Sequence, residues 1–216
     1  MDMNDRVAVV TGASSGIGEA TAKMLADRGA VVILVARNED NGKRVEKEIV
    51  DSGNKAEFYK CDITSNEDVR ALKEYVQKKY GKLNMLFNNA GTLITGALDE
   101  FTEEEWDESY ETNLKSMVRV CREFMDMLVI SHGVVLNNTS INGLHSYIKG
   151  KKSYMYATSK AAAIQFTRYL AKNYAPEVRV NALCPGMTET NLFTNRDFSR
   201  FNDANLLGRM AKPEEI

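Results

Sequence analysis

The stretch TGASSGIG, Thr11 to Gly18, follows directly on the apolar run RVAVV (6–10) and leads into a sequence with helical spacing. Its glycines, Gly12, Gly16 and Gly18, carry no side chain, so the loop can turn tightly and a phosphate can approach its backbone. The amides at the start of the following helix would then face a pyrophosphate. A glycine-rich turn alone is weak evidence, but the order strand, glycine turn, helix is typical of a dinucleotide-binding site.

The spacing GxxxGxG differs from GxGxxG, and no Lys-Ser or Lys-Thr pair follows the last glycine, which excludes a P-loop. The next apolar run, VVILVA (31–36), is followed by Arg37, 19 positions after Gly18. A cofactor with free ribose hydroxyls usually meets an acid at about this point. A guanidinium instead pairs with a 2′-phosphate and can stack on adenine, so we expect NADPH rather than NADH. An ordinary surface arginine is the alternative interpretation.

Short apolar runs alternate with longer amphipathic stretches along the whole chain. Strands are expected at 6–10, 31–36, 56–62, 83–91, 133–140 and 178–186. Helices are expected at 18–30, 65–81, 102–129 (one long helix or two) and 153–174. In the first helix, Ala20, Met24 and Leu25 are expected on one side, with Gly29 as the stop. The pattern predicts a single α/β domain over 1–216 with a doubly wound parallel sheet, binding its ligand beyond the carboxyl ends of the strands.

Composition narrows the possible functions. The 216 residues carry 28 basic and 30 acidic side chains, a net charge of −2, which argues against a nucleic-acid or membrane partner. The short run KGKK (149–152) is interpreted as a solvated loop. Cys61, Cys121 and Cys184 form no CxxC pair and are interpreted as small core residues in a reducing compartment. Neither a signal peptide nor a membrane span is expected, so the prediction is a cytoplasmic protein.

The stretch YMYATSK (154–160) contains two tyrosines, and only one of them has a lysine four residues later. Residues four apart share a helix face, so Lys160 lies beside Tyr156, whereas Tyr154 has only Thr158 in that position. In isolation such a pair seldom means catalysis. Tyr156 is nevertheless the candidate for chemistry, while Tyr154 is expected to line a pocket or pack in the core.

Four patterns occur in order along the chain: TGASSGIG, NNAG (88–91), Ser140 in NNTSING, and YATSK (156–160). Together they resemble the short-chain dehydrogenase/reductase family over essentially the whole chain. The resemblance implies a Rossmann-like NAD(P)-dependent oxidoreductase acting on a small carbonyl or alcohol, and a dimer or tetramer. The catalytic residues it implies are Ser140, Tyr156, Lys160 and Asn113. The cofactor-binding residues expected are Gly12, Ser14, Ser15, Gly16, Ile17, Gly18, Arg37, Asn38, Asp62, Ile63, Asn89, Ala90, Gly91, Tyr156, Lys160, Pro185, Gly186, Thr188 and Thr190.

The resemblance also implies roles for individual residues. Asp62 resembles the residue that bonds the adenine amino group, and 88–91 would line the cofactor cleft. Asn113 resembles the helix asparagine that holds a water in a proton relay. The segment CPGMTET (184–190) resembles the one that turns over the nicotinamide, with its two later threonines near the carboxamide.

Carbonyl reduction needs hydride at carbon, supplied by NADPH, and a proton at oxygen. A free tyrosine, with a pKa near ~10, holds its proton too tightly at neutral pH to act readily as a base. A lysine one turn away stabilises tyrosinate, so Tyr156 could give or take the proton while Ser140 holds the carbonyl oxygen. Asn113 would orient water toward Lys160.

Two features depart from the family pattern. Ser140 and Tyr156 are 16 positions apart, slightly more than usual, and the additional residues should alter the pocket wall. The helix and strand that usually follow PEEI (213–216) are not in the sequence, so an omitted or truncated C-terminus is expected.

Substrate preference is assigned to 142–155 and to a lid at about 187–208. The apolar residues expected in that lid are Met187, Leu192, Phe193, Phe198 and Phe201. His132 is interpreted as structural and His145 as a surface-loop residue. No cluster has metal-ligand spacing, so no metal is expected. The alternative functions are a non-catalytic NADP(H)-binding regulatory protein and, with less support, a structural interaction module.

Overall fold

The computed structural model describes residues 3–145, 153–192 and 206–216 of the chain. The strands are β1 (Val7–Thr11), β2 (Val31–Ala36), β3 (Lys55–Lys60), β4 (Met85–Asn88), β5 (Val134–Asn138) and β6 (Arg179–Leu183). The α-helices are α1 (Gly16–Asp27), α2 (Glu39–Asp51), α3 (Asn66–Tyr80), α4 (Glu103–Tyr110), α5 (Ser116–Ile130) and α6 (Tyr154–Tyr174). Shorter helical turns span Glu111–Lys115 (π-helical), Ile141–Gly143 and Pro213–Glu215.

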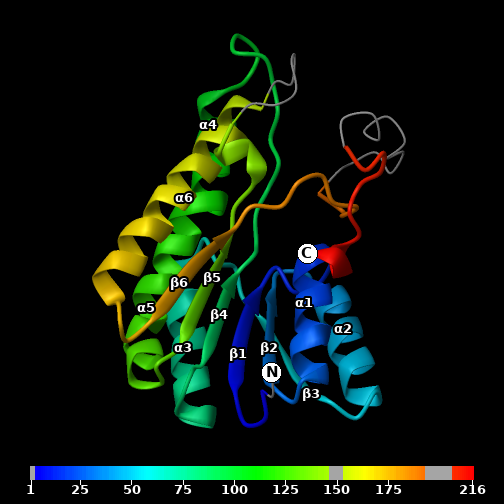
Figure 1. The fold of residues 1–216 in the computed structure, drawn as a ribbon, viewed down its shortest axis with the longest axis vertical. Helices are drawn as coiled ribbons and strands as arrows, with labels where there is room; N and C mark the ends of the chain where they lie inside the picture. The colour runs from blue at the N-terminus through cyan, green and yellow to red at the C-terminus, as the bar shows by residue number, and fades with distance from the viewer. Residues whose placement is uncertain (1–2, 146–152, 193–205) are drawn as a thin grey trace.

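The six strands form one parallel sheet in the order β3-β2-β1-β4-β5-β6 (Figure 1). The chain runs outward from β1 to β3, then returns to β4 on the other side of β1 and continues to β6. The order therefore reverses between β1 and β4, and a ligand site is expected at their carboxyl ends. The predicted single-domain, doubly wound α/β fold is confirmed.

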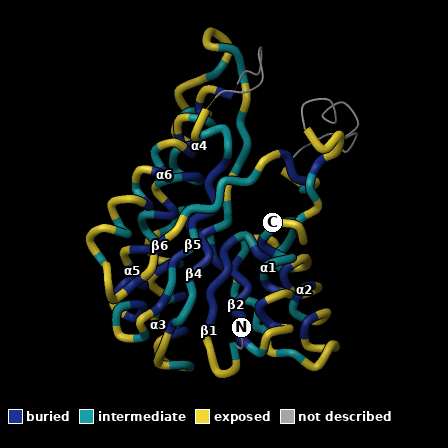
Figure 2. The backbone as a smooth tube through the Cα atoms, in the orientation of Figure 1, coloured by how far each residue is buried: buried dark blue, intermediate teal, exposed yellow. Residues whose placement is uncertain are grey.

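Alternate side chains of each inner strand enter two different cores, one on each face of the sheet. In β1, Val7 and Val9 pack with residues of α3, α5 and α6, whereas Ala8 and Val10 pack with residues of α1 and α2. Strands buried on both faces read as continuous apolar runs, which explains the RVAVV and VVILVA signals. Figure 2 shows the buried strands running through the middle of the molecule, with exposed residues on the outer sides of the helices.

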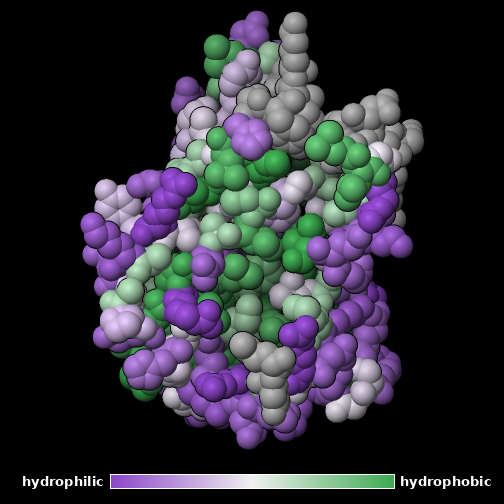
Figure 3. All heavy atoms as spheres, in the orientation of Figure 1, coloured by the Kyte–Doolittle hydropathy of each residue, from purple (hydrophilic) through white to green (hydrophobic). Residues whose placement is uncertain are grey.

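One face of the sheet is covered unevenly in the described part of the chain. Helices α1 and α2 pack over β1–β3, and the same core continues over β4–β6 through the half-buried side chains of Met85, Leu136 and Leu183. Figure 3 shows apolar side chains gathered in the middle of this view, between the two groups of helices. The described sheet ends at β6, which pairs only with β5.

Two details of the structure differ from the sequence-based expectations. Met24 is 46% exposed, and the buried face of α1 carries Gly18, Ala22, Leu25 and Ala26. The expected place of Leu25 is therefore confirmed and that of Met24 is wrong. Helix α2 was not anticipated at all. Of the two alternatives for 102–129, one long helix or two, the structure shows two, α4 and α5, with the π-helical turn between them.

The predicted stop at Gly29 is confirmed, with a left-handed φ of 94°. His132 also has a positive φ, 47°, in the turn that ends α5. Within the described ranges, no helix is long and apolar enough to cross a membrane.

Candidate active site

A cavity of about 410 Å³ lies beyond the carboxyl ends of the strands that flank the reversal of strand order. Its walls come from the glycine loop, the ends of β2, β4 and β5, the start of α6 and the segment after β6. Almost all of the predicted site residues border it. The predicted residues that line the cavity are Gly12, Ser14, Ser15, Gly16, Ile17, Arg37, Asn38, Asp62, Ile63, Asn89, Ala90, Gly91, Ser140, Tyr156, Lys160, Pro185, Gly186, Thr188 and Thr190.

Two predicted residues, Gly18 and Asn113, do not line the cavity. A Cβ added at Gly18 would lie 2.2 Å from the carbonyl oxygen of Gly12 and 2.5 Å from Nδ2 of Asn89. This glycine therefore lets α1 pack against the end of the first strand, whereas Gly12 and Gly16, with φ of 65° and 56°, shape the loop that faces the cavity.

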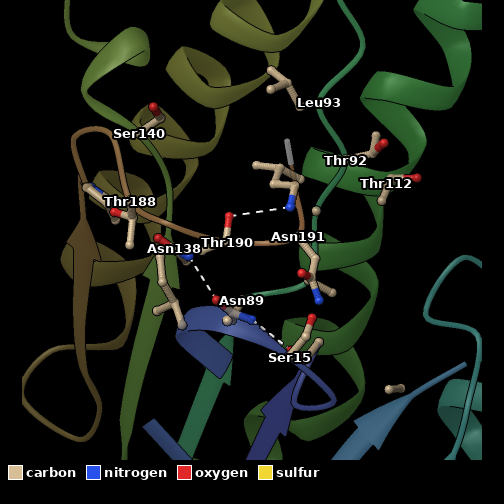
Figure 4. Close-up of a pocket in the computed structure, with 18 of the residues that line it drawn as sticks. Ser15, Asn89, Thr92, Leu93, Thr112, Asn138, Ser140, Thr188, Thr190 and Asn191 are labelled. Atoms are coloured by element: carbon tan, nitrogen blue, oxygen red, sulfur yellow. Dashed lines mark hydrogen bonds between the residues drawn. The ribbon is translucent and has the colours of Figure 1, made fainter. Parts of the chain in front are cut away.

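The glycine loop is held by the segment after β4. The hydroxyl oxygen of Thr11 accepts from the backbone N–H groups of Asn89 (3.0 Å) and Ala90 (3.1 Å). In return, Asn89 Nδ2 donates to the carbonyls of Thr11 (3.0 Å) and Gly12 (3.2 Å). Figure 4 shows Asn89 between Ser15 and Asn138, with one dashed line from Asn89 toward the glycine loop and one to Asn138 at 2.9 Å. The two sides of the strand reversal are thus joined by side chains as well as by the sheet.

The end of the cavity at β2 and β3 carries opposite charges. Arg37 is exposed and lines the wall, and Asn38 beside it caps α2 by accepting from the N–H of Asn41 at 2.9 Å. Asp62 Oδ1 accepts from the amide (2.9 Å) and hydroxyl (2.7 Å) of Thr64. Partial burial raises the pKa of the Asp62 carboxyl, but the Thr64 bonds and the charge of Arg37 outweigh it, and the pKa is lowered. Asp62 is therefore an acceptor at this end.

At the other end, α6 places Tyr156 and Lys160 one turn apart in the cavity wall. Lys160 Nζ donates to the carbonyl of Asn138 at 2.9 Å and lies 5.7 Å from the centroid of the Tyr156 ring. Both side chains are buried, with 8% of Tyr156 and 3% of Lys160 exposed. Burial lowers the pKa of Lys160 to about 8. The ammonium can therefore exist close to neutral pH and act on the phenol through little intervening solvent.

Ser140 follows β5 and is 6% exposed. Its hydroxyl oxygen accepts from the N–H of Asn142 at 3.1 Å, which fixes it at the start of a short helical turn. Ser140 and Thr188 both border the cavity, and both are labelled in Figure 4. The Ser140 hydroxyl proton is the group that could be given to a substrate oxygen.

Asn113 lies in the π-helical turn and is 1% exposed. Its Oδ1 accepts from the N–H of Thr92 at 2.9 Å, and its Nδ2 donates to the Thr92 carbonyl at 3.0 Å and to the hydroxyl of Ser159 at 3.2 Å. The side chain therefore fixes Thr92, which lines the cavity. A water held by Asn113 would have to share a side chain that already has these partners.

Several cavity residues were not assigned from the sequence: Thr64, Thr92, Leu93, Thr112, Asn138, Thr139 and Ile141. Most of them directly follow or precede an assigned motif, so position beyond a strand end could have identified them. Of the expected lid, Met187 and Leu192 line the cavity, whereas Phe193, Phe198 and Phe201 lie outside the described residues, as does KGKK.

Tyr154 contradicts its expected place, because it is 46% exposed and does not line the cavity. It stands two residues from Tyr156 on α6, which turns it toward a different side of the helix. His145 is exposed at the edge of the described residues. In the described part of the chain, no three His, Cys, Asp or Glu side chains are grouped so that they could hold a metal ion.

A glycine loop and a buried tyrosine–lysine pair in one cavity of a doubly wound sheet is the arrangement of a dinucleotide-dependent oxidoreductase. A family model described as short chain dehydrogenase matches residues 6–199. The chain is 37% identical to a 3beta-hydroxysteroid dehydrogenase of Mediterraneibacter gnavus over 193 residues, which are 88% of this chain and 68% of that protein. It is 33% identical to the 3-oxoacyl-(acyl-carrier-protein) reductase FabG of Thermotoga maritima over 222 residues, covering 100% of this chain and 89% of that one.

Solved structures agree. A short-chain type dehydrogenase/reductase from Mycobacterium marinum matches with a TM-score of 0.94 at 30% identity, covering 99% of this chain and 86% of that chain. Actinorhodin polyketide ketoreductase with NADPH matches with a TM-score of 0.91 at 31% identity, covering 100% and 88%. The protein belongs to the short-chain dehydrogenase/reductase family, whose members are NAD(P)-dependent oxidoreductases of alcohol and carbonyl groups.

Proposed function

We propose that the protein is an NADPH-dependent oxidoreductase that reduces a ketone or aldehyde to an alcohol, or catalyses the reverse reaction. The observation that carries this proposal is the buried Tyr156–Lys160 pair, which shares its cavity with the glycine loop. A protein that only binds a dinucleotide needs the loop but has no need of a buried phenol beside a buried lysine.

The residues present fit a dinucleotide. Gly12 borders the cavity, and a Cβ there would lie 2.9 Å from the Cα of Ala90. A larger residue would therefore clash with the segment after β4 and displace the loop that faces the cavity. Asp62 offers a carboxylate at the adenine end, and Arg37 offers a cation beside it for a 2′-phosphate. The bound nicotinamide would supply or accept the hydride. We assign adenine to the end of the cavity with Arg37 and nicotinamide to the end with Tyr156.

In the reducing direction, the Tyr156 phenol gives its proton to the carbonyl oxygen while hydride reaches the carbon; in the oxidising direction, tyrosinate takes the alcohol proton. The Lys160 ammonium stabilises tyrosinate electrostatically, which lowers the cost of either transfer. The Ser140 hydroxyl donates to the same substrate oxygen and holds it against Tyr156. For Asn113, a place in a water relay to Lys160 stays part of this proposal, and its contacts support a second role in fixing Thr92.

The substrate is a small molecule with a carbonyl or secondary alcohol, and we propose that 142–155 and a lid at about 187–208 select it. The relatives include proteins named as a hydroxysteroid dehydrogenase and as 3-oxoacyl and polyketide ketoreductases. Met187 and Leu192 give the described end of the lid an apolar side. A steroid or a β-ketoacyl thioester is thus among the carbonyl compounds to test first.

We also propose a cytoplasmic location and a homo-oligomer. The three free cysteines, Cys61, Cys121 and Cys184, support a reducing compartment. The alternative function, a regulatory protein that binds NADP(H) without turnover, would leave the buried tyrosine–lysine pair without a purpose.

Cofactor preference is tested by titrating the protein with NADPH and NADH, following reduced-nicotinamide fluorescence. We expect tighter binding of NADPH, and we expect Arg37→Ala to weaken NADPH binding about tenfold or more because it removes a charged pair to the 2′-phosphate. The affinity for NADH should change less than about threefold. Arg70→Ala, at an exposed arginine outside the cavity, is the matched control. Equal binding of both cofactors, or preference for NADH, would contradict the Arg37 assignment.

A further inference from the structure

Arg119, on α5, joins two segments of the cavity wall that are far apart in the chain. Its Nε donates to Oδ1 of Asn66 at 2.8 Å, and its Nη1 donates to the carbonyl of Ile63 at 2.9 Å. Its Nη2 donates to Oε1 of Glu111 at 2.6 Å. Only 12% of the Arg119 side chain is exposed, and the residue does not line the cavity. The three nitrogens of one guanidinium therefore connect the loop after β3 with the π-helical turn before α5.

The loop after β3 forms the wall at the end of the cavity that we assign to adenine. Asp62, Ile63 and Thr64 all line the cavity there. Arg119 holds this loop at the carbonyl of Ile63 and again at Asn66, where α3 begins. Loss of these bonds would let the loop shift and change the adenine side of the cavity.

The π-helical turn is the other segment that Arg119 holds. It contains Thr112, which lines the cavity, and Asn113, whose side chain fixes Thr92 in the cavity wall. Turns of this kind are rare and occur frequently at functional sites. The ion pair between Glu111 and Arg119 is largely buried, so solvent and salt screen it less than a surface pair. It can therefore hold the turn in one place.

An arginine suits this position because its planar guanidinium presents several donors in fixed directions. A lysine would carry the same charge on a single nitrogen, which cannot serve three separate acceptors equally well. We propose that Arg119 is a positioning residue that sets the loop after β3 and the π-helical turn relative to each other, and so supports both adenine binding and catalysis. The catalytic part of this role rests on the proposed function.

Variants that remove one contact at a time separate the two effects. Arg119→Met keeps an unbranched side chain but loses all three bonds, whereas Asn66→Ala removes only a bond to the loop and Glu111→Ala only the bond to the turn. Three quantities are measured for each variant. They are the affinity for 2′,5′-ADP, which fills only the adenine half; kcat at saturating NADPH with a carbonyl compound that the wild type reduces; and hydrogen–deuterium exchange of the Thr64 and Thr92 amides.

We expect Arg119→Met to bind 2′,5′-ADP about tenfold more weakly and to lower kcat about tenfold, because small displacements of positioned groups reduce both binding and rate. Both amides should exchange faster in this variant. Asn66→Ala should weaken 2′,5′-ADP binding about threefold with kcat unchanged. Glu111→Ala should lower kcat about fivefold and speed exchange of Thr92 alone, with 2′,5′-ADP affinity unchanged.

Lys115→Ala is the matched control, because Lys115 contacts the other carboxylate oxygen of Glu111 at 3.2 Å but is 63% exposed. It should match the wild type in all three measurements. Arg119→Lys is the second variant in case Arg119→Met folds poorly. Because it keeps the charge but loses the fork of donors, its losses in affinity and kcat should be about threefold to fivefold.

Three results would overturn the proposal. Wild-type affinity and kcat in Arg119→Lys would mean that charge alone is needed at this position. A lower melting temperature of Arg119→Met without a loss of affinity or kcat would make Arg119 a structural contact only. Equal losses of affinity and kcat in Asn66→Ala and Glu111→Ala would mean that the two segments loosen together. If the wild type binds no 2′,5′-ADP or reduces no carbonyl compound, the proposed function fails by itself, and exchange of the two amides still decides whether Arg119 holds both segments.

Discussion

Tyr156 and Lys160 form a buried pair, and burying the amine of Lys160 has a cost in free energy. With only 3% of its surface exposed, Lys160 has its pKa lowered by burial from 10.5 to about 8. Keeping this amine charged in the folded protein therefore costs free energy. This free-energy cost is consistent with a functional role for Lys160 beside the Tyr156 phenol, since groups with strongly shifted pKa values cluster at functional sites.

The lowered pKa of Lys160 predicts how the stability of the protein depends on pH. Between about pH 8 and 10.5 the unfolded chain still binds the Lys160 proton while the folded chain has lost it, so the free energy of unfolding rises with pH across this window. The rise should total about 3 kcal/mol and be absent in Lys160→Met, which should also be the more stable protein below pH 8. Urea unfolding of both proteins at several pH values measures the difference. Parallel curves for the two proteins would contradict the burial of a titrating Lys160.

The site also shows how far single residues can be predicted. Tyr156 followed from a lysine at helical spacing, and Arg37 from its distance to the last glycine. Asn138 could not be predicted in this way, because its importance comes from bonds to Asn89 and Lys160, which are 49 and 22 positions away in the chain. Tyr154 was misplaced because an aromatic side chain near a pocket motif suggests burial, whereas its side of α6 is exposed.

At the scale of elements, the strands were readily predicted and the helix faces were not. Residues buried on both sides give β1 and β2 unbroken apolar runs, which no polar side chain interrupts. Helix α2 escaped prediction because only Gly42, Val45 and Ile49 of its thirteen residues are buried. Met24 was expected on the inner side of α1 beside Leu25, but the buried positions near Leu25 are taken by Gly18, Ala22 and Ala26.

The close approach of α1 gives a test of the Gly18 contact. A methyl group there would meet the Gly12 carbonyl at 2.2 Å, a main-chain atom that cannot swing aside. We expect Gly18→Ala to lower the free energy of unfolding by about 1–3 kcal/mol, because overpacking forces the helix away from the strand end. Gly186→Ala is the control, since its added methyl would meet nothing within 4 Å. Equal stabilities of the two variants in urea would show that α1 does not pack as described.

At the scale of the whole molecule, apolar side chains of the sheet lie between two groups of helices. Met85, Leu136 and Leu183 extend the core of α1 and α2 across β4–β6 but are only half-buried. Contiguous apolar surface of this kind usually marks an interface. We expect light scattering of the purified protein to give a mass of at least about twice 24.2 kDa. A constant monomer mass over a wide range of concentrations would contradict the proposed homo-oligomer.

The arrangement of the molecule explains why the sequence predicts the location of the site but not its substrate. Strand reversal brings the glycine loop, Asn89, Asp62 and Tyr156 to one edge of the sheet, although they are spread from residue 12 to residue 156. The order of the motifs along the chain therefore predicts where the cavity lies and which residues line it. The segments proposed to select the substrate, 142–155 and 187–208, have neither periodicity nor a motif that names a chemical class, so their sequence does not predict the substrate.

The most direct test of the central claim compares Tyr156→Phe with Tyr154→Phe in NADPH-dependent reduction of a panel of ketones, aldehydes and β-ketoacyl thioesters. The two changes remove the same hydroxyl from the same helix, but only Tyr156 lines the cavity. Loss of the acid–base group in Tyr156→Phe should lower kcat by about 10²–10⁴-fold while the Kd for NADPH changes little, and Tyr154→Phe should behave as wild type. Full turnover by Tyr156→Phe would contradict the claim. A wild type that binds NADPH but reduces no compound in the panel would also contradict it and would favour the regulatory alternative.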